Sequence, residues 1–139
     1  MAQATGAGSH NKESLQQMYM DYLVEEGFRP EIDGDGDVHF KKEGRSYYII
    51  VNETDLEYFR LIFPSYWKIE DENERMRVLV AAEVANRTSK VAKTFIVGDS
   101  VTSCAELFVA EPEQFRHVFN RALAALEHGV STFAGKMKE

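Results

Sequence analysis

Three aspartates at alternate positions, Asp33, Asp35 and Asp37, have the spacing that most resembles a metal site. The pattern imitates the start of an EF-hand calcium loop, which requires glycine at its sixth position and a bidentate glutamate at its twelfth. Those two positions hold Val38 and Gly44, and the flanking segments alternate like strands rather than helices. We therefore interpret this stretch as a turn that carries no metal ligand.

The four histidines and the single cysteine form no catalytic or metal-binding pattern. His117 and His128 would lie roughly 16 Å apart along a helix, too far to share one ion. Cys104 lies in a run of small residues, which is typical of a buried structural thiol. No Walker loop and no Gly-x-Ser-x-Gly elbow occurs. We therefore expect no catalytic residue, no metal and no cofactor, and predict that the protein is not an enzyme.

The composition indicates the class of protein and the partners to expect. The chain has 139 residues, of which 44% are hydrophobic, enough for one domain with its own core. The net charge of −7 argues against binding to nucleic acid or to an anionic membrane surface, because both require positive charge. No apolar run is long enough to span a bilayer, and the single cysteine fits a reducing compartment. We therefore expect a cytoplasmic protein of bacterial type.

The helices and strands that would position a functional site are predicted to follow a polar N-terminal segment. Residues 1–12 are small and polar, which predicts a flexible N-terminal tail. Residues 13–135 are predicted to form a single domain, and residues 136–139 to fray. The first amphipathic helix is expected from about Ser14 to Glu26, followed by a short strand and the aspartate-rich turn.

A β-hairpin is predicted directly after this turn. Placing Glu43–Gly44 in a two-residue loop pairs Phe40 with Tyr47 and Val38 with Ile49. These four apolar residues would all point to one face of the hairpin. That face is expected to belong to the core.

The opposite face of the hairpin supplies the candidate binding residues. It pairs His39 with Tyr48 and also carries Ile50, a set too apolar to remain in water, so either the chain itself or a partner must cover it. Tyr66 and Trp67 are adjacent in an extended segment, so at least one of them should face away from the main core. Aromatic residues at such positions are enriched in protein interfaces.

A short helix is predicted between the two halves of the chain. Thr54 with Glu57 forms a capping-box pattern, which indicates a helix from about Asp55 to Ile62. Pro64 would end this helix, because the residue before a proline disfavours helical geometry. The helix is a candidate cover for the aromatic residues on either side of it.

The second half begins with a central helix from Asp71 to about Thr88. Met76, Leu79 and Val80, with Ala82 to Ala85, give this helix a broad apolar stripe, made largely of small residues, that we expect to face the core.

A second hairpin should follow the central helix. We predict a three-residue loop, Gly98–Ser100, between residues 91–97 and 101–109, which would place Phe95 and Val101 on the same face.

The last helix starts near Pro112 and has the most regular apolar spacing of the chain. The resulting order, α-β-β-β-α-α-β-β-α, predicts an α+β fold in which helices flank an antiparallel sheet.

The order and several local motifs together resemble those of YbjN-like domains, also called bacterial sensory transduction regulators. The motifs are Asn86–Arg87 at a helix end, Lys93 in the next strand, the acidic–Pro–acidic start of the last helix at Glu111–Glu113, and the FPSYW segment at residues 63–67. The resemblance extends from about residue 15 to residue 133. It implies a fold similar to that of type III secretion chaperones, often dimeric, with a protein-binding role and no catalytic residue to carry over.

The leading hypothesis from the sequence is a non-enzymatic, chaperone-like or regulatory module that binds a protein or peptide segment. His39, Tyr48, Ile50, Tyr66 and Trp67 are its candidate contact residues. The first alternative is a homodimer that buries the same surface in a two-fold interface. The second is a small-ligand protein or an enzyme without a familiar motif.

Overall fold

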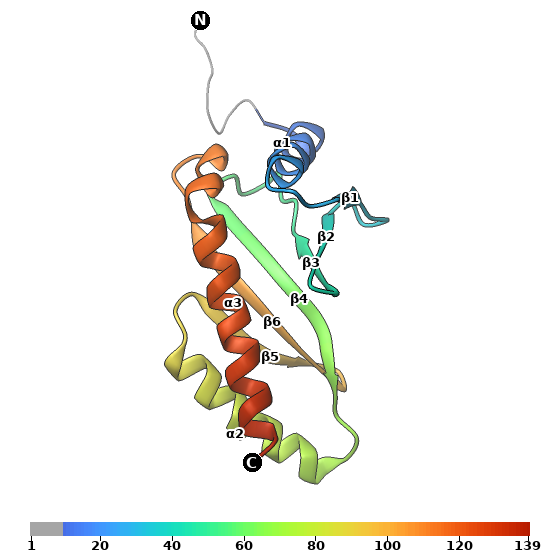
Figure 1. Ribbon diagram of the computed structural model, residues 1–139, viewed down its shortest axis with the longest axis vertical. Coiled ribbons are helices and arrows are strands. Elements are labelled where there is room, and N and C mark those ends of the chain that lie inside the picture. The colour runs from blue at the N-terminus through green and yellow to red at the C-terminus, as the bar shows by residue number, and fades with distance from the viewer. Residues whose placement is uncertain (1–9) are drawn as a thin grey trace, which may run out of the picture. The chain divides into compact units, whose positions relative to one another are not determined.

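The computed structural model describes residues 10–139, whose elements follow the order α-β-β-β-β-α-β-β-α (Figure 1). The helices are α1 (Lys12–Glu25), α2 (Glu72–Thr88) and α3 (Phe115–Met137), with a 3₁₀ turn η2 (Pro112–Gln114) before α3. The strands are β1 (Glu31–Ile32), β2 (Val38–Lys42), β3 (Arg45–Ile49), β4 (Tyr58–Lys68), β5 (Ala92–Val97) and β6 (Ser100–Phe108). The predicted α+β class is confirmed.

Hydrogen bonds join the strands in the order β1-β2-β3-β4-β6-β5, so β1 and β5 are the edge strands. The pairs β1–β2, β2–β3 and β5–β6 are antiparallel. Most of the predicted N-terminal tail, residues 1–9, lies outside the described residues. The end of the chain, predicted to fray, continues α3 as far as Met137, whose side chain is buried.

The described residues group into two compact units. The hairpin unit contains residues 10–61 and Leu107–Phe119, and the α2 unit contains Ile62–Glu106 and Asn120–Glu139. Each unit has buried apolar residues of its own.

The first hairpin of the hairpin unit has the predicted register. Phe40 pairs with Tyr47 and His39 with Tyr48. Glu43 and Gly44 have φ angles of 53° and 81°, the positive values that a two-residue hairpin turn requires at both central positions. The pleat therefore sends Phe40 and Tyr47 into the core and turns His39 and Tyr48 to the other face.

The core of the hairpin unit is rich in aromatic rings. The side chain of Asn11 accepts a hydrogen bond from the Ser14 amide and caps α1. The capped helix brings Tyr19 edge-on to Phe115, with ring centroids 4.9 Å apart. Phe59 lies 5.8 Å from the same Phe115 ring. The edge-to-face pair of Tyr19 and Phe115 is favourable beyond its apolar burial. Phe119, further along α3, reaches the hairpin, with its ring centroid 5.8 Å from that of Phe40.

The predicted short helix Asp55–Ile62 is wrong, because residues from Tyr58 onward form strand β4. The capping signal is local, and Asn52 rather than a helix satisfies it: its side-chain oxygen accepts hydrogen bonds from the Thr54 amide and hydroxyl. The following YFRLIF segment is aromatic and branched, and it gains a hydrogen-bonded neighbour on both sides by lying between β3 and β6. Pairing within the sheet therefore overrides the helical signal.

The second hairpin turns more tightly than predicted. Val97 pairs with Ser100 across a two-residue loop, and Gly98 has a φ of 62° at the first central position, as in a type II′ turn. In this register Ile96, not Phe95, shares a face with Val101. The prediction of a three-residue loop is therefore wrong, and Phe95 lies on the opposite face.

The core of the α2 unit is formed by side chains from α2, α3 and the sheet. Phe133 on α3 is fully buried and receives Tyr66 and Trp67 edge-on, with ring centroids 5.9 and 5.5 Å away. Val78 of α2 and Val101 of β6 belong to the same buried cluster. This cluster fixes which side of α2 faces inward.

Candidate protein-binding surface

Helix α2 turns its small residues inward and its large ones outward. Asp71 caps the helix by accepting a hydrogen bond from the Glu74 amide, as its sequence predicts. Val78 and the alanines at positions 81, 82 and 85 are buried. Met76, Leu79 and Val80, here called the outer stripe, are 63%, 50% and 57% exposed.

The expectation that the outer stripe faces the core is therefore wrong. The apolar residues of α2 cover more of the helix surface than one packing face can bury. The row that contains three alanines lies inside, because small side chains allow the helix to approach the sheet closely. The larger side chains on the adjacent rows are left at the surface.

A shallow hollow of about 660 Å³ separates α2 from the edge strand β5. We call it the edge hollow. Its lining is more apolar than polar and is formed by Leu79, Ala82, Glu83, Asn86, Arg87, Thr94, Phe95 and Ile96. A concave apolar surface beside an exposed apolar helix face is the kind of surface that partners bury.

Asn86 bridges the hollow to the backbone of β5. Its side-chain oxygen accepts a hydrogen bond of 2.7 Å from the Thr94 amide, and its side-chain nitrogen donates one of 3.1 Å to the Thr94 carbonyl. The two bonds satisfy both backbone groups of Thr94 at the edge of the sheet.

Thr94 of β5 is also held by its side chain, through hydroxyl groups. The hydroxyl oxygens of Thr94 and Ser103 lie 2.7 Å apart, and that of Ser103 lies 2.7 Å from the Tyr66 hydroxyl. Thr94 and Ser103 are 3% and 0% exposed, so their two hydroxyls are shielded from water. These bonds anchor β5 independently of Asn86.

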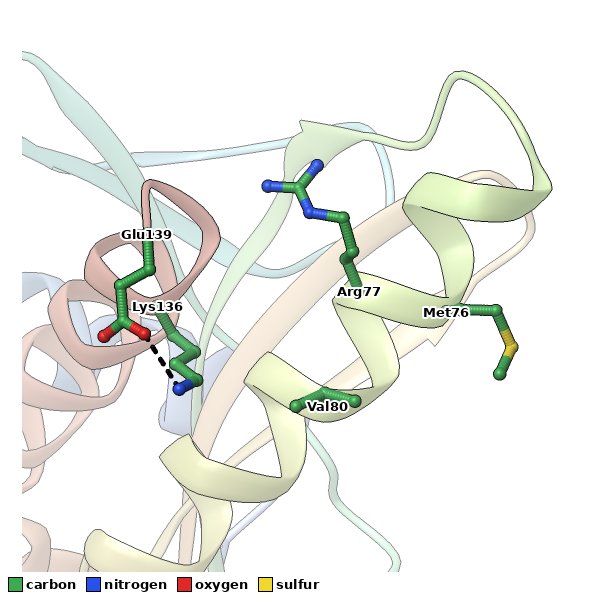
Figure 2. A pocket seen from close by; sticks show the side chains of 5 residues that line it. All are labelled: Met76, Arg77, Val80, Lys136 and Glu139. Carbon is green, nitrogen blue, oxygen red and sulfur yellow. Dashed lines mark hydrogen bonds and ion pairs between the residues drawn. The ribbon is translucent and has the colours of Figure 1, made fainter.

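A second hollow, of about 340 Å³, lies between the first half of α2 and the end of the chain (Figure 2). Met76 and Val80 form its apolar side, and the ion pair between Lys136 of α3 and Glu139 beyond the end of that helix, at 2.9 Å, lines the opposite side. Arg77 donates a hydrogen bond to the Met137 carbonyl. The outer stripe is thus a ridge with a hollow on each side.

Charged residues surround the outer stripe. Arg87 pairs with Glu83 at 3.0 Å, and that contact raises the pKa of Arg87. Arg75 contacts both Glu72, at 3.4 Å, and Asp99, at 2.8 Å. A charged rim around an apolar centre is the usual composition of a protein interface.

The structure places Tyr66 and Trp67 against the core of the α2 unit. Both are half-buried, and both rings contact Phe133. The Trp67 indole nitrogen also donates a hydrogen bond of 3.1 Å to the Glu74 carboxylate. Ser65, directly before them, has a φ of 50°, a positive value outside regular strand geometry. These contacts give both residues a structural role.

The structure brings His39 and Tyr48 together on the outer face of the first hairpin. Their ring centroids are 5.0 Å apart, and both residues are half-buried. The imidazole nitrogens of His39 lie 3.2 Å from a Glu31 carboxylate oxygen and 3.0 Å from the Ser46 hydroxyl. Ile50 is half-buried one residue beyond β3. The three candidates therefore form a partly exposed surface of the hairpin unit.

The aspartate-rich turn shows hydrogen bonds of its own. The Asp33 carboxylate accepts hydrogen bonds from the Asp35 and Asp37 amides. The Asp37 carboxylate accepts one from the Val51 amide, while burial raises the pKa of this carboxyl. Among residues 10–139, no group of three His, Cys, Asp or Glu side chains is arranged to hold a metal ion.

The sequence interpretation missed Asn86, Leu79 and Phe108 as surface-forming residues. Phe108 is 81% exposed at the end of β6 in the hairpin unit. The one available signal for Leu79 was the excess width of the apolar stripe on α2. Nothing in the local sequence indicates that the Asn86 amide would meet a strand edge, because that contact depends on the packing of α2 beside β5.

No helix within the described part of the chain is long and apolar enough to cross a membrane. Comparison of the sequence with models of known protein families gave no match, and comparison with curated proteins gave no match either.

Proposed function

We infer that this chain is a non-enzymatic protein-binding module, and that the outer stripe of α2 with the edge hollow is its main contact surface. The exposure of Met76, Leu79 and Val80 carries this proposal. Exposing three large apolar side chains of one helix face to water is unfavourable. Burying them against a partner would therefore contribute favourable free energy of binding. The partner is a protein or peptide segment rather than nucleic acid or membrane, because the chain carries a net charge of −7.

The resemblance to YbjN-like domains supports the same class of function, a chaperone-like or regulatory role in the bacterial cytoplasm. The buried thiol of Cys104, the single cysteine of the chain, also fits a reducing compartment. The proposal assigns no catalytic residue and no cofactor.

Affinity capture with a surface variant and a matched control tests the proposal. The variant Leu79→Ser and Val80→Ser removes the centre of the outer stripe, while Ala124→Ser changes an exposed position on α3. Both proteins should keep the fluorescence of the single tryptophan, Trp67, which reports that the core is intact. We expect a partner that wild type and Ala124→Ser retain and the double variant loses. A partner retained equally by all three proteins would contradict the assignment of this surface.

The outer face of the first hairpin remains a second predicted contact surface. Tyr48→Ala combined with Ile50→Ser should weaken capture of the same or another partner without unfolding the chain. If the folded variant retains every partner of the wild type, this surface has no binding role.

A homodimer is the second candidate function, and the charge pattern of α2 favours it. Glu72, Met76, Val80 and Arg87 recur at helical spacing on one face. An antiparallel pair of α2 helices, with its two-fold axis between Leu79 and Val80, would place Glu72 opposite Arg87 of the second copy. The interface is self-complementary in charge and apolar at its centre.

Sedimentation with charge reversal tests the dimer. Glu72→Arg or Arg87→Glu alone should shift the chain toward monomer, because each places like charges opposite one another. The double variant should restore the dimer. A wild-type chain that stays monomeric at high concentration would rule out this candidate.

A further inference from the structure

The outer edge of β5 has the geometry to pair with a further strand. In an antiparallel pair, backbone groups point alternately toward the partner strand and away from it. The groups of Thr94 point away from β6, because both bind Asn86. The same alternation directs the corresponding groups of Ile96 outward, along the edge hollow.

The Asn86 amide imitates the peptide group of a neighbouring strand. It offers one acceptor and one donor to Thr94, as a strand would. It does so from an exposed side chain on α2 rather than from a backbone. A real peptide group can therefore replace it with little net change in hydrogen bonding. Because Ser103 holds the Thr94 side chain from within, β5 keeps its place when Asn86 leaves.

We propose that the edge hollow receives an extended polypeptide segment that pairs with the outer edge of β5. This segment displaces the Asn86 side chain from the backbone of Thr94. The inference rests on the proposed protein-binding function and specifies its ligand. Alternate side chains of the segment enter the hollow at Leu79 and Ile96, while its backbone takes over the bonds to Thr94.

Charge complementarity defines the segment further. Arg87, Lys90 and Lys93 lie within seven positions of one another around the start of β5, in a chain that is acidic overall, and Arg87 pairs with Glu83 and Lys93 with Glu106. An acidic residue at the corresponding end of the segment would complement these cations and would set the direction of pairing. The ligand class is thus an extended segment with alternating apolar residues and an acidic end.

A peptide selected for binding to the full-length chain serves as the probe. A phage-displayed library of random decapeptides is selected on the wild-type protein, and the strongest binder is synthesised with a single N-methyl group at each position in turn. N-methylation removes one backbone donor. We expect a loss of about tenfold at alternate positions and little loss between them, because only every second amide of a paired strand faces β5.

The variant Asn86→Ala tests whether the bound peptide displaces the Asn86 side chain from Thr94 or whether Asn86 simply contacts the peptide. Removing the competitor should tighten binding of the selected peptide by about two- to tenfold. Thr88→Ala, an exposed change on the same helix, should leave the affinity unchanged. Unchanged or weaker binding by folded Asn86→Ala would overturn the displacement of Asn86.

The outcomes distinguish this inference from the function on which it rests. A peptide that loses affinity in Leu79→Ser but tolerates N-methylation at every position would refute strand pairing and leave the protein-binding surface intact. A library that yields no peptide dependent on Leu79 would overturn the inference. If, in addition, no protein partner depends on Leu79, the proposed function fails with it.

Discussion

Two valines on α2 provide a matched pair for testing which face of the helix points inward. Val78 is fully buried and Val80 is 57% exposed. The substitutions Val78→Ala and Val80→Ala remove the same two methyl groups at positions two residues apart. Both raise the intrinsic helix propensity by the same amount, so that contribution cancels in the comparison.

The expected difference follows from burial alone. Val78→Ala loses the transfer free energy of two buried methyl groups and leaves a small cavity, which together lower the free energy of unfolding by about 2 kcal/mol. Val80→Ala loses little burial, so its helix propensity makes it neutral or stabilising by up to about 0.5 kcal/mol. The two variants should therefore differ by about 2 kcal/mol.

Urea denaturation followed by tryptophan fluorescence measures this difference. Trp67 is the single tryptophan and packs against the cluster that contains Val78, so its emission reports on the same unit. Equal destabilisation by the two substitutions, or greater destabilisation by Val80→Ala, would show that the outer stripe is buried. The proposed binding surface would then not exist.

Three further predictions test the polar groups of both units. Ser103→Ala leaves the buried Thr94 hydroxyl and the hydroxyl of the half-buried Tyr66 without their shared partner and should lower the free energy of unfolding by about 1–3 kcal/mol in urea denaturation. Asp37→Asn should be at least as stable as wild type at pH 7, because its amide oxygen can still accept the hydrogen bond from the Val51 amide without burying a charge. Burial raises the pKa of Asp37 above its ordinary value of 3.8, so the folded chain favours the protonated carboxyl. The stabilising contribution of this carboxyl is therefore complete below pH 3.8 and is lost as the pH rises through the raised pKa. The advantage of Asp37→Asn should therefore shrink as the pH falls to 3.8, which stability curves measured at several pH values would show. Burial also raises the pKa of Tyr19 to about 12, so Tyr19→Phe should leave the tyrosinate absorbance of the folded chain unchanged at pH 10; a drop at that pH would contradict this burial.

Local patterns in the sequence predict much of the fold. The Glu43–Gly44 turn determines the register of the first hairpin, because only a two-residue loop places Phe40 opposite Tyr47 with both on the core face. The cap at Asp71 likewise marks the start of α2. In these cases the short-range signal and the tertiary structure agree.

The errors arise where distant pairing decides the outcome. A capping pattern at Thr54 predicts a helix, but the residues from Tyr58 onward gain more by filling a place in the middle of the sheet. The orientation of α2 could not be predicted for a similar reason. Its apolar residues are compatible with several inward faces, and the position of Phe133 on α3 selects the one with small side chains. The contact of Asn86 with Thr94 depends on that selection.

Site-specific photocrosslinking in the cells from which the protein comes tests the central claim most directly. A benzophenone amino acid replaces Leu79 in the outer stripe or, as a control, Ala124 on the exposed face of α3. We predict a discrete adduct at position 79 and none of the same mass at position 124. The adduct mass distinguishes a partner polypeptide from a second copy of the chain. No adduct at position 79, or the same adducts at both positions, would contradict a binding surface on α2.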